Sequence, residues 1–152
     1  MSTNGHNQRI SDSAFWQPLL KTYSRAPSVA LCRVPELEYA STLSLDGVTL
    51  DHCCGDGLFA KIGWPTAKFT HGCDLNEVSL KDAARLNRHD QLDLCDAGKH
   101  LPYKDRYFDL IFDNSALEHI PDLHQTLSEI ARVLKPGGIF SFNVLNHRYF
   151  EW

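Results

Sequence analysis

Residues 48–60 read VTLDHCCGDGLFA, a short apolar run that breaks into a turn with two glycines. We interpret the run as a β-strand that leads into a cofactor loop and then into a helix. Gly55 and Gly57 lack a Cβ, so the backbone can approach a ligand closely there. The first N–H groups of the following helix would point toward the same ligand. The stretch therefore predicts a nucleotide-type cofactor at the carboxyl end of a strand.

The remainder of the chain alternates predicted strands and helices. This alternation favours a Rossmann-like α/β fold, a three-layer sandwich around a mostly parallel central sheet. Helices are expected at about 56–62, at about 76–87 with Asn76 as N-cap, and from the capping pair Asp122 and Gln125 to the turn at 136–138. The strands are expected at about 48–52, 68–73, 91–95, 107–113 and 139–145.

Two kinds of cofactor are compatible with the glycine loop. Gly55-x-Gly57-x-x-Ala60 fits the dinucleotide pattern G-x-G-x-x-G/A, with Asp74 near the position of a ribose-binding carboxylate. A second acid, Asp96, follows further on, and a nicotinamide site has no standard use for it. Asp96 and the missing third glycine disfavour an NAD-dependent oxidoreductase, which stays open as an alternative.

Several further segments follow the loop in order: Asp74, Asp96-Ala97, residues 101–112, residues 114–122 and residues 134–138. Together with Asp51 to Gly57, which follows most of a D-x-G-x-G-x-G motif, they resemble the class I S-adenosylmethionine-dependent methyltransferases, in particular those with a methyltransferase type 11 domain. The resemblance covers about residues 48–145, and the ordered set is much more specific than any one of its members.

The resemblance implies S-adenosyl-L-methionine as the cofactor. Asp74 would accept hydrogen bonds from the ribose hydroxyls, and Asp96 with Ala97 would hold the adenine, whose exocyclic amine donates to an acceptor. Nearby acids are tolerable because the sulfonium and the amino group of this cofactor are cationic. The expected cofactor-binding residues are Asp51, Cys53, Gly55, Gly57, Asp74, Leu75, Asp96, Ala97 and Asn114.

Cys53 stands where the resembled motif has its first glycine. If the backbone needs a positive φ at this position, a cysteine side chain costs on the order of 1 kcal/mol or more. We interpret Cys53 as tolerated in the loop.

The resemblance also implies methyl transfer to a small-molecule acceptor, through an oxygen, nitrogen or carbon nucleophile. Such a transfer is an in-line displacement on an activated carbon, so the protein mainly orients the nucleophile in a dry site. A general base is needed only where the acceptor must lose a proton. His119, in the predicted loop after the fourth strand, is the candidate base, although a histidine there is more often structural or a substrate contact. Glu118 and Asn114 are further pocket candidates.

Residues 1–46 precede the predicted sheet and are expected to be helical. Ser11 can cap a first helix, and a second helix is expected over residues 35–43. These helices either form a lid over cofactor and substrate or pack against one face of the core. Residues 47–152 are expected to form the S-adenosylmethionine-binding domain.

Charge and hydropathy argue against two classes of partner. The formal net charge is −4, with acids and bases interspersed, whereas a nucleic-acid-binding protein would show a basic stripe. No apolar run approaches the length of a membrane span, and the N-terminus has no apolar signal region. A cytoplasmic protein without a membrane or nucleic-acid partner is expected.

The cysteines admit two interpretations. Their odd number, five, and the lack of a C-x-x-C pair argue against a disulfide scaffold. Cys53, Cys54, Cys73 and Cys95 fall near the ends of adjacent predicted strands, so a metal or redox cluster is one interpretation. We favour the other, small buried apolar side chains, because the acids beside them already have a role. No metal is expected.

The end of the chain falls short of the resembled fold. A complete sheet in that family has seven strands in the order 3-2-1-4-5-7-6, whereas this sequence stops soon after the fifth. Strands six and seven are therefore expected to be missing, and residues 149–152 look like the start of a connection. A fifth strand at a free edge would favour a homo-oligomer or a completing partner.

Two further alternatives stay open. One is a non-catalytic S-adenosylmethionine-binding module or fragment. The other is a macromolecular methyltransferase. Enzymes that methylate amino groups of nucleic-acid bases usually carry a D/N-P-P-Y/F-type motif after strand four, and the segment at 113–116 reads DNSA here. This sequence disfavours base methylation and leaves protein substrates open.

Overall fold

The computed structural model describes residues 10–144. The chain divides into two compact units between Ser44 and Leu45, and each unit is described by itself. The predicted cap at residues 1–46 stays a prediction as far as its function is concerned. The apolar tail at 149–152, on which part of the interpretation of the C-terminus rested, lies outside the described residues.

The N-terminal unit contains a 3-10 turn η1 (Ile10–Asp12) and helices α1 (Trp16–Thr22) and α2 (Pro27–Ala40), with α1 packed on α2. The prediction that Ser11 caps the first helix is wrong, because Ser11 lies inside η1 and α1 begins only after Phe15. The side chain that bonds the chain near the start of α1 is Ser13, whose Oγ accepts from the Phe15 N–H at 3.3 Å.

Helix α2 corrects the prediction of a helix over residues 35–43. It begins at Pro27, a first-turn position where the missing N–H costs nothing, and it continues through Pro35. An interior proline costs about 3 kcal/mol of helix stability, but Pro35 itself is exposed. The buried residues on both sides of it keep the helical spacing, and this stripe explains why the helix is not broken: Ala30, Val34, Leu37 and Ala40.

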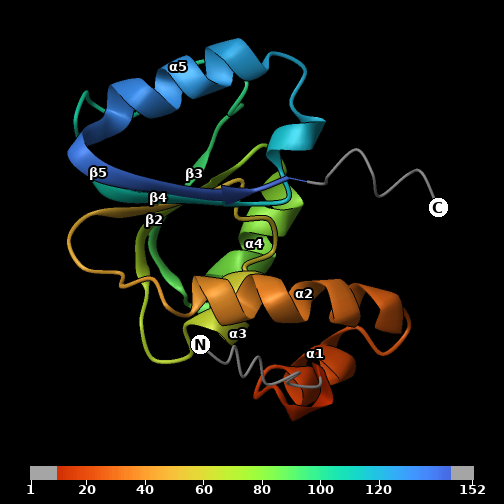
Figure 1. Ribbon diagram of the computed structural model, residues 1–152. Helices are drawn as coiled ribbons and strands as arrows, with labels where there is room; N and C mark the ends of the chain where they lie inside the picture. Colours follow the sequence, from red (N-terminus) through yellow and green to blue (C-terminus); the bar gives the residue numbers. More distant parts are fainter. Residues whose placement is uncertain (1–9, 145–152) are drawn as a thin grey trace. The chain divides into compact units, whose positions relative to one another are not determined.

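The second unit contains a five-stranded parallel sheet in the order β3-β2-β1-β4-β5 (Figure 1). This arrangement confirms the predicted Rossmann-like α/β fold class and the predicted strand order up to the fifth strand. The central strand β1 is buried along its whole length, as strands of parallel sheets are when helices cover both faces. The strands are β1 (Thr49–His52), β2 (Phe69–Asp74), β3 (His89–Leu94), β4 (Phe108–Asn114) and β5 (Leu134–Asn143).

Helices flank this sheet on both sides (Figure 1). The Asn76 carboxamide caps α4 by accepting from the Val78 and Ser79 N–H groups, as predicted. The Asp122 carboxylate caps α5 by accepting from the Gln125 N–H at 2.9 Å. The helices are α3 (Leu58–Gly63), α4 (Glu77–Leu86), the 3-10 turn η2 (Leu117–His119) and α5 (Leu123–Val133).

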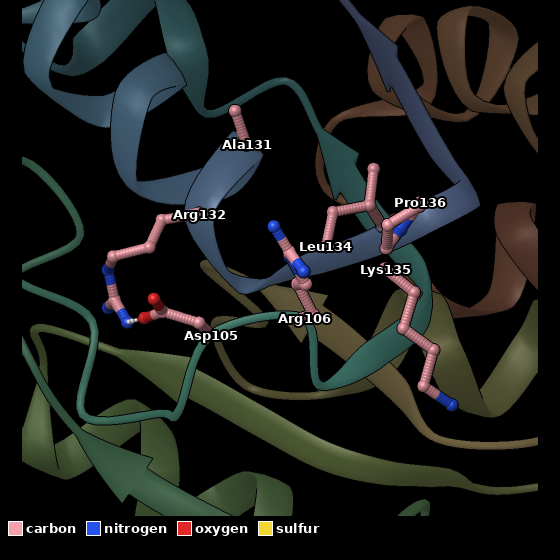
Figure 2. A pocket seen from close by; sticks show the side chains of 7 residues that line it. All are labelled: Asp105, Arg106, Ala131, Arg132, Leu134, Lys135 and Pro136. Atoms are coloured by element: carbon pink, nitrogen blue, oxygen red, sulfur yellow. Dashed lines mark hydrogen bonds and ion pairs between the residues drawn. The ribbon is translucent and has the colours of Figure 1, made fainter.

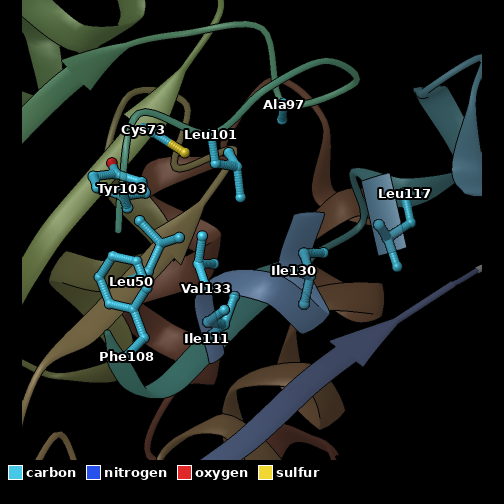
Figure 3. Close-up of a cluster of buried hydrophobic side chains, with 10 residues drawn as sticks. All are labelled: Leu50, Cys73, Ala97, Leu101, Tyr103, Phe108, Ile111, Leu117, Ile130 and Val133. Atoms are coloured by element: carbon cyan, nitrogen blue, oxygen red, sulfur yellow. The ribbon is translucent and has the colours of Figure 1, made fainter. Parts of the chain in front are cut away.

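Apolar side chains fill the space on both faces of the sheet. Ile111 and Phe112 are consecutive in β4 and therefore point to opposite faces. Ile111 belongs to the cluster that packs under α5 with Ile130 and Val133 (Figure 3). Phe112 packs against an aromatic group on the other face, where its ring centroid lies 5.2 Å from that of Trp64. The sheet is thereby fixed from both sides, and its strand ends are held in register.

Strand β5 corrects the predicted end of α5. The helix ends at Val133, and β5 begins directly at Leu134, which pairs with Phe108. The Pro-Gly-Gly sequence at 136–138, predicted to be a turn, lies within the strand instead. The register shifts between Phe108 and Leu110 and Gly137 has φ +80°, so these residues form a bulge-like irregularity in a continuous strand. The strand ends at Asn143, and Leu145, its predicted end, lies outside the described residues.

Candidate cofactor site at the carboxyl ends of the strands

The loop after β1 has an unusual backbone. Cys53, Gly55 and Gly57 all adopt positive φ, at 55°, 55° and 74°. The conditional cost attached to Cys53 therefore applies, because a residue with a Cβ in the left-handed region is strained by about 1 kcal/mol or more. Two left-handed glycines and a left-handed cysteine turn the chain sharply between β1 and α3.

The side chain of Asp74, the last residue of β2, accepts a hydrogen bond from this loop. Its Oδ2 accepts from the Gly55 N–H at 2.9 Å, and its Oδ1 accepts from the Asn76 N–H at 2.8 Å. A Cβ built on Gly55 would meet nothing within 4 Å among the described residues, so the space beside this glycine is open. The structure thus brings Gly55 and Asp74 together with room next to them, as a ligand that approaches the backbone requires.

Gly57 has a different neighbourhood from Gly55. A Cβ added there would lie 3.2 Å from both Cα and Cβ of Ala83 in α4. The glycine therefore permits close packing between the loop and α4. Its predicted contact with the cofactor stays a prediction.

Asp96 and Ala97 follow β3 at the same edge of the sheet. The Cys95 N–H donates to the Asp74 carbonyl at 3.0 Å, which places the segment after β3 beside the end of β2. Asp96 accepts from the Gly98 N–H at 3.0 Å and lies 3.1 Å from Lys99 Nζ. Hydrogen bonding from Lys99, and then from the Gly98 N–H, holds the pKa of Asp96 below its usual range. Ala97 is buried in the core, and its contact with the cofactor stays a prediction.

The other predicted residues lie at or directly after the ends of β2 and β4, or in the turn η2. Leu75 is exposed directly after Asp74. Asn114 ends β4, and the Ser115 N–H beyond it donates to Asn143 Oδ1 at 2.6 Å, which ties the loop to β5. His119 ends the turn η2 with an exposed side chain. Its role as a base stays a prediction.

Asp51 takes part in a buried pair that sequence analysis missed. Its Oδ2 lies 2.7 Å from Nε2 of His89, the first residue of β3. Burial, partly offset by His89, raises the pKa of Asp51. The side chain is thus engaged within the sheet, and contact with a cofactor stays a prediction for it as well.

A second buried pair joins β1 to β4. His52 Nδ1 lies 2.6 Å from Asp113 Oδ2, and neither side chain is exposed to solvent. His52 and Asp113 are also direct partners in the strand register. Two polar residues at the ends of adjacent apolar runs, one in each strand, were the available signal for this pair.

An open hollow of about 440 Å³ lies at the opposite end of the sheet, where β4 and β5 begin (Figure 2). Arg132 and Asp105 both line it, with Arg132 Nη1 2.8 Å from Asp105 Oδ1. Lys135 and Arg106 line it as well. None of the predicted cofactor residues lines this hollow. The candidate site is therefore the edge formed by the carboxyl ends of the strands.

Comparison with known proteins decides the family. The methyltransferase domain family matches residues 50–142, which is more than half of the chain. The chain belongs to the class I S-adenosylmethionine-dependent methyltransferases. The family implies use of S-adenosylmethionine, so it favours this cofactor over a nicotinamide dinucleotide at the glycine loop.

Two curated methyltransferases show the extent of the similarity. The malonyl-[acyl-carrier protein] O-methyltransferase 1 of Coxiella burnetii is 53% identical over 111 residues, 66% of this chain and 36% of that protein. The demethylmenaquinone methyltransferase of Lactobacillus johnsonii is 39% identical over 99 residues, 59% of this chain and 40% of that protein. The chain thus spans about two fifths of the length of these methyltransferase relatives.

Solved methyltransferase structures share the fold. A putative methyltransferase from Bacillus halodurans superposes with a TM-score of 0.59 at 28% identity, over 71% of this chain and 48% of that one. A methyltransferase from Thermotoga maritima, described as a possible histamine N-methyltransferase, gives a TM-score of 0.64 at 23% identity, over 83% and 58%. The second likeness supports the methyltransferase fold alone.

Within residues 10–144, every helix is too short or too polar to cross a bilayer.

Proposed function

We propose that this domain binds S-adenosylmethionine along the carboxyl ends of β1, β2 and β3 and serves methyl transfer to a small-molecule acceptor. The observation that carries the proposal is the hydrogen bond from the Gly55 N–H to the Asp74 carboxylate, with open space next to Gly55. Asp96, on the neighbouring strand end, supplies a second carboxylate at the same edge. The cofactor would supply an activated methyl group on a sulfonium.

The acceptor sites of the two carboxylates fit a ribose and an adenine. An ionised carboxylate offers about four lone-pair positions. Asp74 uses one of these positions to accept from the Gly55 N–H and another to accept from the Asn76 N–H. Asp96 accepts from the Gly98 N–H and also forms an ion pair with Lys99. Each side chain therefore keeps capacity to accept hydrogen bonds from ligand hydroxyls or an amine. The acids Asp74 and Asp96 also suit a ligand whose methionine part carries positive charge.

The acceptor is proposed from the relatives. Their names specify a demethylated menaquinone and a malonyl group on a carrier protein. We propose a small organic acceptor of this range, and His119 as its base where the nucleophile is a hydroxyl. The exposed position of His119 at the end of η2, in the segment after β4, supports this proposal.

Asp74→Asn tests the proposed site. Replacing an ionised acceptor by an amide removes hydrogen bonds worth about 1.5–3 kcal/mol, so the Kd for S-adenosylhomocysteine should rise about 10- to 100-fold. Asp82→Asn, on the exposed surface of α4, is the matched control and should leave Kd unchanged. Equal Kd values for the wild type and Asp74→Asn would remove Asp74 from the site.

A separate measurement distinguishes an enzyme from a non-catalytic binding module. The chain is incubated with S-adenosylmethionine labelled in the methyl group, together with quinone-type and thioester-linked acid acceptors. Transfer of label to an acceptor supports methyl transfer, and the Asp74→Asn variant should reduce it. Tight cofactor binding without label transfer to any of these acceptors would favour the binding module.

A further inference from the structure

Three potential metal ligands converge just below the cofactor edge. The ligand atoms of His52, Cys53 and Asp113 lie within 4.8 Å of one another. His52 ends β1, Cys53 follows it, and Asp113 is the register partner of His52 on β4. An imidazole, a thiol and a carboxylate at one place form a mixed N, S and O set, which is the kind of set that zinc prefers.

The hydrogen bonding of His52 fixes the state of its ring. With Nδ1 at 2.6 Å from a carboxylate oxygen of Asp113, the Nδ1–H donates to that oxygen. The neutral ring then presents a lone pair at Nε2. Among residues 10–144, this buried Nε2 has no hydrogen-bond partner. Buried polar atoms without a partner are rare, and a bound ligand at this place would account for one.

Cys53 adds a second, independent feature. It is held at φ 55°, in the left-handed region that a residue with a Cβ rarely adopts. Strained residues of this kind cluster at functional sites. Its thiol is half-buried, so it is within reach of an ion that enters from the loop. A cysteine thiol is protonated near neutral pH, so metal binding by Cys53 releases its proton.

We propose that His52, Cys53 and Asp113 form a binding site for Zn²⁺ or a closely related transition-metal ion. Each residue supplies one ligand atom: an imidazole nitrogen of His52, Sγ of Cys53 and a carboxylate oxygen of Asp113. Binding replaces the S–H bond of Cys53 by an S–Zn bond and releases one proton to solvent, while the zinc ion stays divalent. This proposal does not rest on methyl transfer. Metal binding is measured without cofactor or acceptor, so either proposal can fail without the other.

The test uses the full chain, first stripped of metal with a chelator. Zn²⁺ is titrated in competition with a chromophoric chelator, and Co²⁺ is titrated separately to read the thiolate-to-metal absorption band. We expect one ion per chain, release of one proton per ion, and a Co²⁺ band that indicates a single thiolate ligand.

Two cysteine variants decide the assignment. Cys53→Ser should weaken Zn²⁺ binding by at least about 100-fold and abolish the Co²⁺ band, since it removes the only thiolate of the proposed ligand set. Cys54→Ser changes the next residue of the same loop, also half-buried, and should do neither. Asp113→Asn, checked for folding by circular dichroism, should weaken binding about 10- to 100-fold while the thiolate band persists. Substoichiometric binding by the wild type, or equal binding by Cys53→Ser, would overturn the proposal.

Discussion

The buried pair His52–Asp113 makes a quantitative prediction for stability. Both side chains are fully buried, and Asp113 is the partner that satisfies Nδ1 of the ring. Asp113→Ala would leave two unpaired ring nitrogens in the core, because Nε2 already lacks a partner among the described residues. Leaving a buried donor without its partner costs about 1–3 kcal/mol, and more where the lost partner is charged. With a total stability of about 5–15 kcal/mol expected for a domain, this variant should lose a large share of its stability.

The double variant His52→Leu, Asp113→Val removes both partners of the pair and leaves neither of them unpaired in the core. Replacing both partners of a buried hydrogen bond by apolar groups of the same shape can be nearly neutral or stabilising. The double variant should therefore be more stable than Asp113→Ala by about 1–3 kcal/mol. Urea unfolding followed by circular dichroism, with a chelator present throughout, measures each free energy of unfolding. An Asp113→Ala variant within about 1 kcal/mol of the wild type would refute this reasoning.

Three other predictions follow from single features of the structure. Gly57→Ala should lower the free energy of unfolding by about 2–4 kcal/mol, because of backbone strain and a clash with α4. Gly55→Ala should lower it by only about 1 kcal/mol but should weaken cofactor binding. Thermal unfolding measures the first effect, and calorimetric titration measures the second. Hydrogen bonding from Arg132 lowers the pKa of Glu129 to about 2, so its contribution to stability is present above pH ~5 and is lost as the pH falls toward ~2; urea unfolding at several pH values should show a weaker acid dependence for Glu129→Gln. Arg106 is exposed at φ 53°, and Arg106→Gly should raise the free energy of unfolding by about 0.5–1 kcal/mol, while Arg106→Ala, which keeps the strain, should not; equal stability of the two variants would contradict the strain argument.

The sheet could be predicted because its signals are local and repeated. Strand β4 is a largely apolar run, and each of the five strands was expected within a few residues of its observed position, apart from the start of β5. The start of β5 was missed because Pro136 and two glycines are turn residues in most contexts, yet here the pairing with β4 carries the strand through them. Likewise Pro35 was taken as a helix boundary, whereas the buried stripe of α2 runs past it.

The candidate site was predictable only in part. The order of Gly55, Asp74 and Asp96 along the chain indicated that they meet at one edge, and the structure brings Gly55 and Asp74 into contact. The partners of Asp51 and His52 were not predictable, because they come from β3 and β4, far along the chain, and depend on the strand register. The set of Cys53 with a histidine and an aspartate was not predicted, because Asp113 lies far along the chain and only the strand register brings it beside His52.

Calorimetric titration of the purified chain with S-adenosylhomocysteine and, separately, with NAD tests the central claim most directly. S-Adenosylhomocysteine keeps the ribose, adenine and amino acid that the proposed edge would hold, and it cannot be consumed. We expect one binding site for S-adenosylhomocysteine and no heat of binding for NAD. Binding of NAD with no binding of S-adenosylhomocysteine would contradict the assignment of the edge formed by Gly55, Asp74 and Asp96.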